Sequence, residues 1–374
     1  MIKMLFFFLL IGCFTQTTNA QKKYLDVDTV SIPESNCKSV EDLSAYIKQH
    51  FATDTSRVRA IYLWVANHIR YDLNRMQRSI NNPQTEPQTV ADVLRVRSAV
   101  CQGYSELFTA LCKSVGINTI LVGGYAKIGD KTLPMAHAWV AAEFDGEWFL
   151  FDPTWGAGYV ANNQFVKQFT NAFYKQSPKE MIADHMPFDP LYQFLSYPKS
   201  NREFIDGTLA ANKLLFNYKD SLQQYTKLSP AQQTTAQLRR LEAAGIENDL
   251  LRKEKEFLKK NLQIYSSENA NDGAQKNFAR AVTLLNEYYG EKNKQFSNIS
   301  DNDLLIRLDS MKHHIKLARS FASEAIIQNE EQQRIKSNNL ASMDKYWAQL
   351  NQEELFIKLY IDTDKPSRRR LFMR

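Results

Sequence analysis

Cysteine is scarce in this sequence, with four residues among 374. Such a low number excludes a small disulfide-stapled fold, because cysteine makes up about a tenth of the residues in those chains. The remaining composition is that of an ordinary globular protein, with 44% hydrophobic and 24% charged residues. A chain of this length predicts two domains, each large enough to bury a core.

Beyond the first 20 residues, the sequence has no apolar run long enough to cross a membrane as a helix. The first 20 residues, MIKMLFFFLLIGCFTQTTNA, predict an export signal, in which Lys3 precedes a short apolar stretch. We expect cleavage after Ala20, which leaves three cysteines and therefore at least one unpaired thiol. The stretch LIGC also resembles a bacterial lipobox, which would place a lipid anchor on Cys13, and this alternative stays open. Both interpretations place the protein outside the cytoplasm, in the periplasm, at the cell surface or secreted.

Charge of one sign is not concentrated in any part of the chain. The formal net charge is +6 and the isoelectric point is near 8.9, which is mild for this length. Lys and Arg are spread along the sequence, apart from one short run at 368–370. Nucleic-acid binders usually gather basic residues with interleaved aromatics on one element. The pattern therefore favours a solvated basic surface and predicts no nucleic-acid partner.

Proline is nearly missing from the second half of the chain, since nine of the eleven prolines precede residue 200. That half is rich in residues that favour helices. We predict a domain of mixed helices and strands at 21–207, which includes a loop at 82–87 (NPQTEP). An all-helical region follows at 208–374, with breaks near Pro230, at 266–273 (SSENANDG) and at 297–303 (SNISDND).

The stretch VCQGYSELFTALC, residues 100–112, places a cysteine directly before a helical pattern. Apolar residues follow Cys101 at spacings of three and four, and Gly116 fits the C-terminal end of a helix. At a helix N-terminus, free N–H groups and the helix dipole favour a thiolate. A lone cysteine is more often a buried, inert residue, so this position alone leaves both interpretations open. Cys112 lies about 16 Å further along the same helix and is assigned to the core.

A hairpin is predicted in AHAWVAAEFDGEWFLFDPTW, where Asp145-Gly146 joins two apolar runs. A two-residue turn there sets a register in which Asp152 lies opposite Trp139. His137 points to the same face as Trp139, because side chains alternate along a strand. We therefore expect His137 and Asp152 to be diagonal neighbours, unless a one-residue bulge separates them.

The sequence therefore predicts a catalytic triad made of Cys101, His137 and Asp152. The cysteine would attack, the imidazole would carry the proton, and the carboxylate would hold the imidazole in one tautomer. Taken singly, an ordinary strand histidine and an aspartate that caps the turn at Pro153 are common. Their joint occurrence favours catalysis. A zinc site built from the same three residues is less favoured, because a catalytic zinc needs at least three ligands and an open position.

Several segments resemble the transglutaminase-like superfamily, which has a papain-like core. They are RAIYLWVANHIRYD, CQGYSELFTALCKSVGI, HAWV and WFLFDPTWGAGY. The order of the family motif, Cys then His then Asp, is matched by Cys101, His137 and Asp152. The later segment FYKQSPKEMIADHMPFDPLYQFL resembles the kyphoscoliosis-peptidase type. Its His185 matches a histidine of that type, for which we expect a structural role that ties a loop to the core. The resemblance covers 40–205.

This resemblance implies an α+β fold, in which a cysteine-bearing helix packs on an antiparallel sheet that carries the histidine and the aspartate. It implies acyl transfer at an amide bond through a thioester, with the backbone N–H of Cys101 as the first oxyanion donor. We expect hydrolysis ahead of cross-linking, because water is the default acceptor. No cofactor is expected, and the expected substrate is a peptide or protein, with cell-envelope material as one option. Some members have lost the triad, so a non-catalytic scaffold or binding protein is the alternative.

Overall fold

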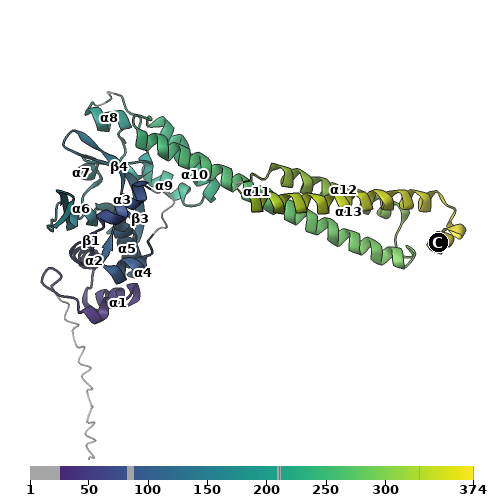
Figure 1. Cartoon of the computed structure of the whole chain (residues 1–374), viewed down its shortest axis with the longest axis horizontal. Coiled ribbons are helices and arrows are strands. Elements are labelled where there is room, and N and C mark those ends of the chain that lie inside the picture. Colours follow the sequence, from purple (N-terminus) through teal and green to yellow (C-terminus); the bar gives the residue numbers. More distant parts are fainter. Residues whose placement is uncertain (1–25, 82–87, 209, 211, 328, 374) are drawn as a thin grey trace, which may run out of the picture. The chain divides into compact units, whose positions relative to one another are not determined.

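The computed structural model describes residues 26–81, 88–208, 210, 212–327 and 329–373. The predicted export signal and Cys13 lie outside these residues, as does the loop predicted at 82–87. Contacts divide the chain into two compact units, Met1–Pro187 and Phe188–Arg374 (Figure 1). The boundary predicted after residue 207 falls within the second of these units. Across the described ranges, every helix is too short or too polar to cross a membrane.

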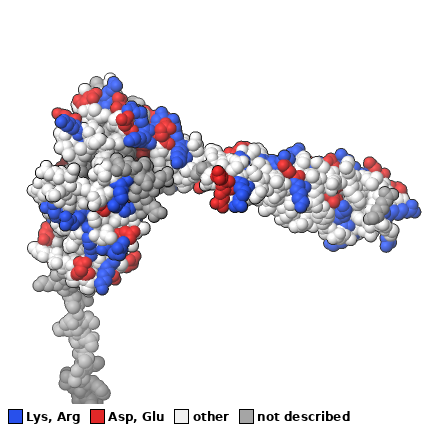
Figure 2. All heavy atoms as spheres, viewed as in Figure 1, with Lys and Arg blue, Asp and Glu red and all other residues white. Residues whose placement is uncertain are grey.

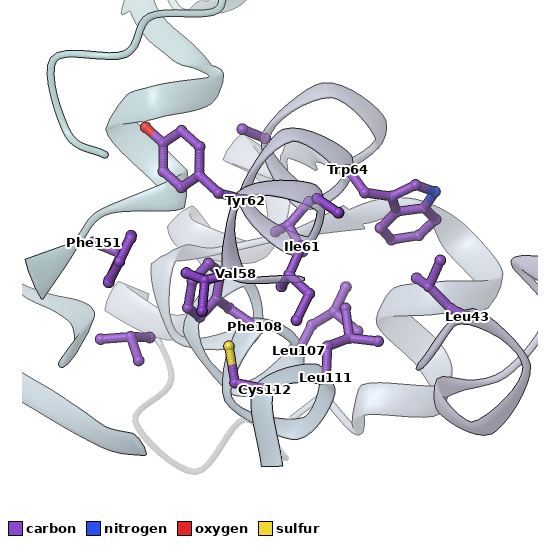
Figure 3. Packing of buried hydrophobic residues seen from close by; sticks show 14 of the residues in the cluster. Leu43, Val58, Ile61, Tyr62, Trp64, Leu107, Phe108, Leu111, Cys112 and Phe151 are labelled. Carbon is purple, nitrogen blue, oxygen red and sulfur yellow. The ribbon is translucent and has the colours of Figure 1, made fainter. Parts of the chain in front are cut away.

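Helix α5 (Cys101–Ser114) runs through the core of the first unit. Its apolar side chains follow the predicted spacing, and Leu107, Phe108 and Leu111 are fully buried. They pack against buried residues of α2 (Asp54–His68), as Figure 3 shows. Burial of each such side chain contributes about 1.5–3 kcal/mol to stability. Cys112 lies in this cluster, where burial raises the pKa of its thiol, so its predicted place in the core is confirmed.

Four antiparallel strands form the main sheet in the order β5–β4–β3–β8. Their bounds are Asn118–Ile128 for β3, Lys131–Phe144 for β4, Glu147–Phe151 for β5 and His185–Pro187 for β8. The predicted hairpin is confirmed, since Phe144 pairs with Glu147 across the turn. The turn residues Asp145 and Gly146 have φ angles of 56° and 78°, as a two-residue hairpin turn requires. The pairing then continues to the end of β5 without a bulge.

Strand β8 pairs with β3 at Gly124, where there is no room for a side chain. A Cβ atom added to Gly124 would stand 2.2 Å from the carbonyl oxygen of Met186 and 2.5 Å from the ring of Trp139. Only glycine allows this approach of backbone to backbone. The glycine therefore sets the distance at which β8 joins the sheet.

Shorter elements complete the first unit. They are η1 (Glu34–Asn36), α1 (Val40–His50), β1 (Arg70–Tyr71), α3 (Leu73–Asn81), α4 (Val90–Val96), β2 (Ser98–Ala99), α6 (Pro153–Ala157), β6 (Gly158–Ala161), β7 (Gln164–Lys167) and α7 (Pro178–Met181). Strands β1 and β2 pair in parallel, and β6 and β7 form a hairpin. Helices packed on an antiparallel sheet give the α+β class that the sequence predicts.

The described residues of the second unit form helices and connecting segments. The helices are η2 (Pro190–Gln193), α8 (Asn201–Asp206), α9 (Tyr218–Tyr225), α10 (Pro230–Ala243), α11 (Asp249–Asn293), α12 (Asp301–Glu324), α13 (Glu330–Asp362) and η3 (Lys365–Phe372). Helix α12 packs against both α11 and α13 (Figure 1). Two of the predicted breaks are present, because Pro230 is the first residue of α10 and 297–303 contains the start of α12.

The break predicted at 266–273 is wrong, since α11 continues through this segment. Its small residues serve helix packing instead. The ring of Phe321 packs against Gly273, where a Cβ atom would stand 2.8 Å away. The hydroxyl of Ser267 donates to the backbone oxygen of Ile326 over 3.1 Å and accepts from its N–H over 3.0 Å. Tertiary contacts therefore override the weak helix propensity of these residues.

Basic and acidic side chains are intermixed on the face shown in Figure 2. In the C-terminal run of arginines, Arg368 donates to both carboxylate oxygens of Asp301, over 2.7 and 2.8 Å. This pairing neutralises part of the run, in keeping with a solvated surface of mixed charge.

Candidate active site

Cys101 is the first residue of α5, at the helix N-terminus where the sequence places it. The hydroxyl of Tyr104, one turn along, donates to the backbone oxygen of Ile69 over 2.7 Å and so ties the first turn of α5 to the end of α2. The first N–H groups of a helix have no partner within it, so they are available near the sulfur. The side chain of Cys101 is half-buried, whereas those of Cys37 and Cys112 are buried.

His137 and Asp152 are in direct contact, as the hairpin register predicts. Nε2 of His137 donates to Oδ2 of Asp152 over 2.7 Å. His137 is 9% exposed and Asp152 is fully buried. Burial would raise the pKa of Asp152, but the charge and hydrogen bond of His137 and a hydrogen bond from His185 hold it well below its usual range.

The pKa of His137 is shifted in the opposite direction. Burial alone would lower it, but the charge and hydrogen bond of Asp152, together with a hydrogen bond and charge from Cys101, raise the pKa to about 10. At neutral pH the imidazole is therefore cationic beside an ionised carboxylate. Because Nε2 faces Asp152, the nitrogen left for the sulfur of Cys101 is Nδ1. The three residues predicted from the sequence thus lie in one continuous chain of contacts.

The second carboxylate oxygen of Asp152 has a structural task. Oδ1 accepts from the backbone N–H groups of Thr154 and Trp155 over 2.8 and 3.0 Å, and so caps α6. The capping role that the sequence suggested as an alternative is therefore real, and it accompanies the contact with His137. A carboxylate fixed on both oxygens orients the imidazole with little freedom.

His185 belongs to the site, although the sequence indicated only a structural role for it. It is fully buried on β8, and its Nε2 lies 3.1 Å from the same Oδ2 of Asp152. Its Nδ1 lies 2.5 Å from Oδ1 of Asp184. The motif match at His185 was a visible signal. Its partner could not be identified, because the contact depends on the pairing of β8 with β3.

An apolar groove of about 760 Å³ lies beside His137. Its lining includes no Asp, Glu, Lys or Arg among the described residues, and its few polar members are Thr154, Gln168, Thr170 and His137 itself. The larger apolar side chains come from four segments of the first unit. They are Tyr71, Leu73, Met76, Ile128, Leu133, Met135, Trp155, Tyr159, Val160, Phe165 and Phe173.

The side chains of His137, Asp152 and His185 include residue types found in metal centres, and their polar atoms lie within 4.8 Å of one another. Here both imidazoles direct a nitrogen at Oδ2 of Asp152 at hydrogen-bonding distance. The cluster is therefore a hydrogen-bond network. The less favoured zinc site of Cys101, His137 and Asp152 stays a prediction, which elemental analysis of protein purified without chelator would test.

Comparison with known families adds a second line of evidence. Residues 41–153 match the Transglutaminase-like superfamily model, and this range includes Cys101, His137 and Asp152. The chain contains a transglutaminase-like domain. Human kyphoscoliosis peptidase is 33% identical over 173 residues, which cover 44% of this chain and 26% of the human protein. Hillarin from Drosophila melanogaster is 23% identical over 217 residues, which cover 52% of this chain and 26% of hillarin.

The similarity to human and mouse kyphoscoliosis peptidase supports the resemblance to the kyphoscoliosis-peptidase type. The chain spans about a quarter of the length of these curated relatives. A solved TGase structure is 19% identical with a TM-score of 0.24, and the match covers 34% of this chain and 35% of that one.

Proposed function

We propose that the transglutaminase-like domain is a thiol enzyme that cleaves amide or peptide bonds through a thioester on Cys101. Water is the favoured acceptor, which makes the enzyme a peptidase or amidase rather than a cross-linker. The observation that supports this most is the chain of contacts from the half-buried thiol through His137 to the buried Asp152. A cationic imidazole between a thiol and a carboxylate is the arrangement that thiol acyl transfer needs.

In the proposed reaction, His137 holds the proton of Cys101 while the sulfur attacks the carbonyl carbon of the substrate. The imidazolium then gives this proton to the leaving nitrogen as the C–N bond breaks, which leaves the acyl group on sulfur. Water adds next to the thioester and gives a proton to His137. The carboxylic acid leaves, and the proton returns to the sulfur. Asp152 keeps its charge throughout and stabilises the imidazolium.

Charge on the substrate oxygen requires hydrogen-bond donors. The backbone N–H of Cys101 lies at the helix N-terminus and is the first donor in this proposal. The neighbouring Gln102 has another partner, because its side-chain amide donates to Glu106 over 2.8 Å on the same helix. We therefore assign no oxyanion role to Gln102.

The groove beside His137 supports a preference for apolar substrates. A lining without charged side chains favours large aliphatic and aromatic residues, and each extra methylene is worth about 1–3 kcal/mol of discrimination at most. We expect peptides with Phe, Leu or Met next to the cleaved bond to be favoured about tenfold or more over peptides with Asp or Lys. Cleavage of a positional peptide library checks this. The variant Val160→Lys, at an exposed position of the groove, should reduce the preference. An unchanged profile in this variant would remove the groove from substrate recognition.

Selective alkylation tests the proposed nucleophile without knowledge of the substrate. Native protein treated with iodoacetamide at neutral pH should be labelled at Cys101 first. Burial raises the pKa of both other thiols in the described residues, Cys37 and Cys112. Peptide mapping by mass spectrometry gives the rate at each site, and His137→Gln should slow labelling of Cys101 alone. Equal labelling of all three thiols, or labelling only after unfolding, would count against the proposal.

We also propose that the enzyme acts outside the cytoplasm, on a peptide or protein that includes cell-envelope material among the options. The support is the sequence of residues 1–20, which predicts an export signal, with a lipid anchor at Cys13 as the open alternative. Mass spectrometry of the mature N-terminus in the native host distinguishes cleavage after Ala20 from lipidation at Cys13.

A further inference from the structure

His185 is a buried imidazole whose two ring nitrogens both face carboxylate oxygens. Nε2 lies 3.1 Å from Oδ2 of Asp152, and Nδ1 lies 2.5 Å from Oδ1 of Asp184. Trp155 and Trp139 pack on its ring, with centroid distances of 4.6 and 5.1 Å. Its side chain is 0% exposed, so it cannot touch a substrate. Any contribution to the reaction must therefore pass through its neighbours in the site, the ring of His137 at a centroid distance of 5.5 Å and Asp152, to which it is hydrogen-bonded.

The contacts of Asp152 define what that contribution is. Oδ2 faces two imidazoles, His137 at 2.7 Å and His185 at 3.1 Å, while Oδ1 is occupied by the N–H groups that start α6. A carboxylate oxygen accepts through two lone pairs, so each imidazole occupies one of those on Oδ2. Both imidazoles therefore compete for the same oxygen of Asp152, and His185 is held from its other side by Asp184.

We propose that His185 is a positioning residue for the thiol site: it donates to Oδ2 of Asp152, is held from its other side by Asp184, and limits how strongly Asp152 binds the proton of His137. This role rests on the proposed function, in which that proton moves between Cys101, the substrate and water. A carboxylate that served His137 alone would hold the proton more tightly and release it less readily to the leaving nitrogen. The second imidazole therefore weakens the hold of Asp152 on this proton.

Other titratable groups also face this pair. Cys101 lies at the far side of His137, and Asp184 lies behind His185. Three tyrosines of the surrounding elements feel the charge of Asp152, but burial is the first cause of their raised pKa values. They are Tyr62, Tyr71 and Tyr104. These phenols stay neutral across the physiological range, so they add no charge beside His137 and His185.

Histidine NMR of the full chain tests this inference directly. The chain has six histidines, and His137→Gln identifies the resonances of His137. In His185→Leu we expect the pKa of His137 to rise by about one unit, a typical effect of one lost hydrogen-bonded neighbour. Its Nε2–H proton, observed at neutral pH, should move downfield as the bond to Asp152 strengthens. His185→Gln keeps a donor near Oδ2. It should therefore change the pKa of His137 and the chemical shift of its Nε2–H proton by less than His185→Leu does.

A purely structural role for His185 predicts a different result. In that case His185→Leu lowers thermal stability but leaves the pKa and the Nε2–H shift of His137 unchanged, which overturns the inference. If His185→Leu does not fold, Asp184→Asn decides, because that side chain is 34% exposed and its loss weakens the hold on His185. Asp184→Asn should raise the pKa of His137 by less than His185→Leu does. An unchanged pKa of His137 in this variant would overturn the inference. Failure of the proposed function is separable, since it appears as alkylation of Cys101 that does not respond to His137→Gln.

Discussion

Replacement of Cys101 by alanine is expected to lower kcat/KM for amide cleavage by at least about a thousandfold. The sulfur is the atom on which the acyl group would reside, and no other thiol of the described residues lies at the N-terminus of α5. Cys112 is on the same helix but fully buried in the core (Figure 3). Cleavage of the peptides preferred in the library measures this loss.

Two matched variants accompany this experiment. Cys112→Ala removes a thiol from the same helix and should keep near-normal turnover in the folded protein. His137→Gln should cause a loss similar to that of Cys101→Ala, and the double variant should be little worse than either single one, because the two residues act as a unit. Full turnover in Cys101→Ala would refute the thioester. If that variant also supports every cellular role, the alternative of a non-catalytic scaffold is preferred.

The second large effect is expected on stability, from Asp152→Asn. The amide keeps an oxygen that can cap α6 but removes the charge that faces two buried imidazoles. Breaking a buried pair by removal of one partner typically costs about 3–5 kcal/mol, and we expect a loss of this size in the free energy of unfolding. Urea denaturation at neutral pH measures it. Asp130→Asn, at an exposed turn between β3 and β4, should change stability by less than about 0.5 kcal/mol.

The stability difference between wild type and Asp152→Asn should depend on pH in a defined way. The folded pKa of Asp152 is depressed, so its contribution is present above the unfolded value near 3.9 and is lost as the pH falls below it. The folded pKa of His137 is raised to about 10, so its contribution is complete below about 6.5 and is lost as the pH rises toward 10. The difference should therefore be largest between about pH 4 and 6.5. A difference that grows between pH 7 and 10 would contradict the pairing.

Local patterns predicted the parts of the site that depend on short stretches of chain. The apolar spacing after Cys101 placed it at the start of a helix, and the turn at Asp145-Gly146 fixed the register that joins His137 to Asp152. Both inferences need only the geometry of one helix or one hairpin. The family resemblance pointed to the same three residues.

Long-range packing determined what the sequence did not predict. His185 reaches Asp152 only because a three-residue strand pairs with β3, and a strand that short leaves no periodic pattern to recognise. Helix α11 continues through 266–273, where Gly273 packs on Phe321 of α12 and Ser267 bonds Ile326, just past the end of that helix. In isolation these small and polar residues favour a break, and only the neighbouring helix reverses that preference.

Because β8 lies late in the sequence of the first unit, the candidate site can be completed only late in synthesis on the ribosome. The three residues of the proposed triad have all been synthesised by residue 152, yet His185 follows 33 residues later on the strand that pairs with β3 at Gly124. A nascent chain that ends before β8 thus carries reactive groups without their final support. We therefore expect Cys101 to reach its final reactivity only after β8 has been synthesised and has paired with β3.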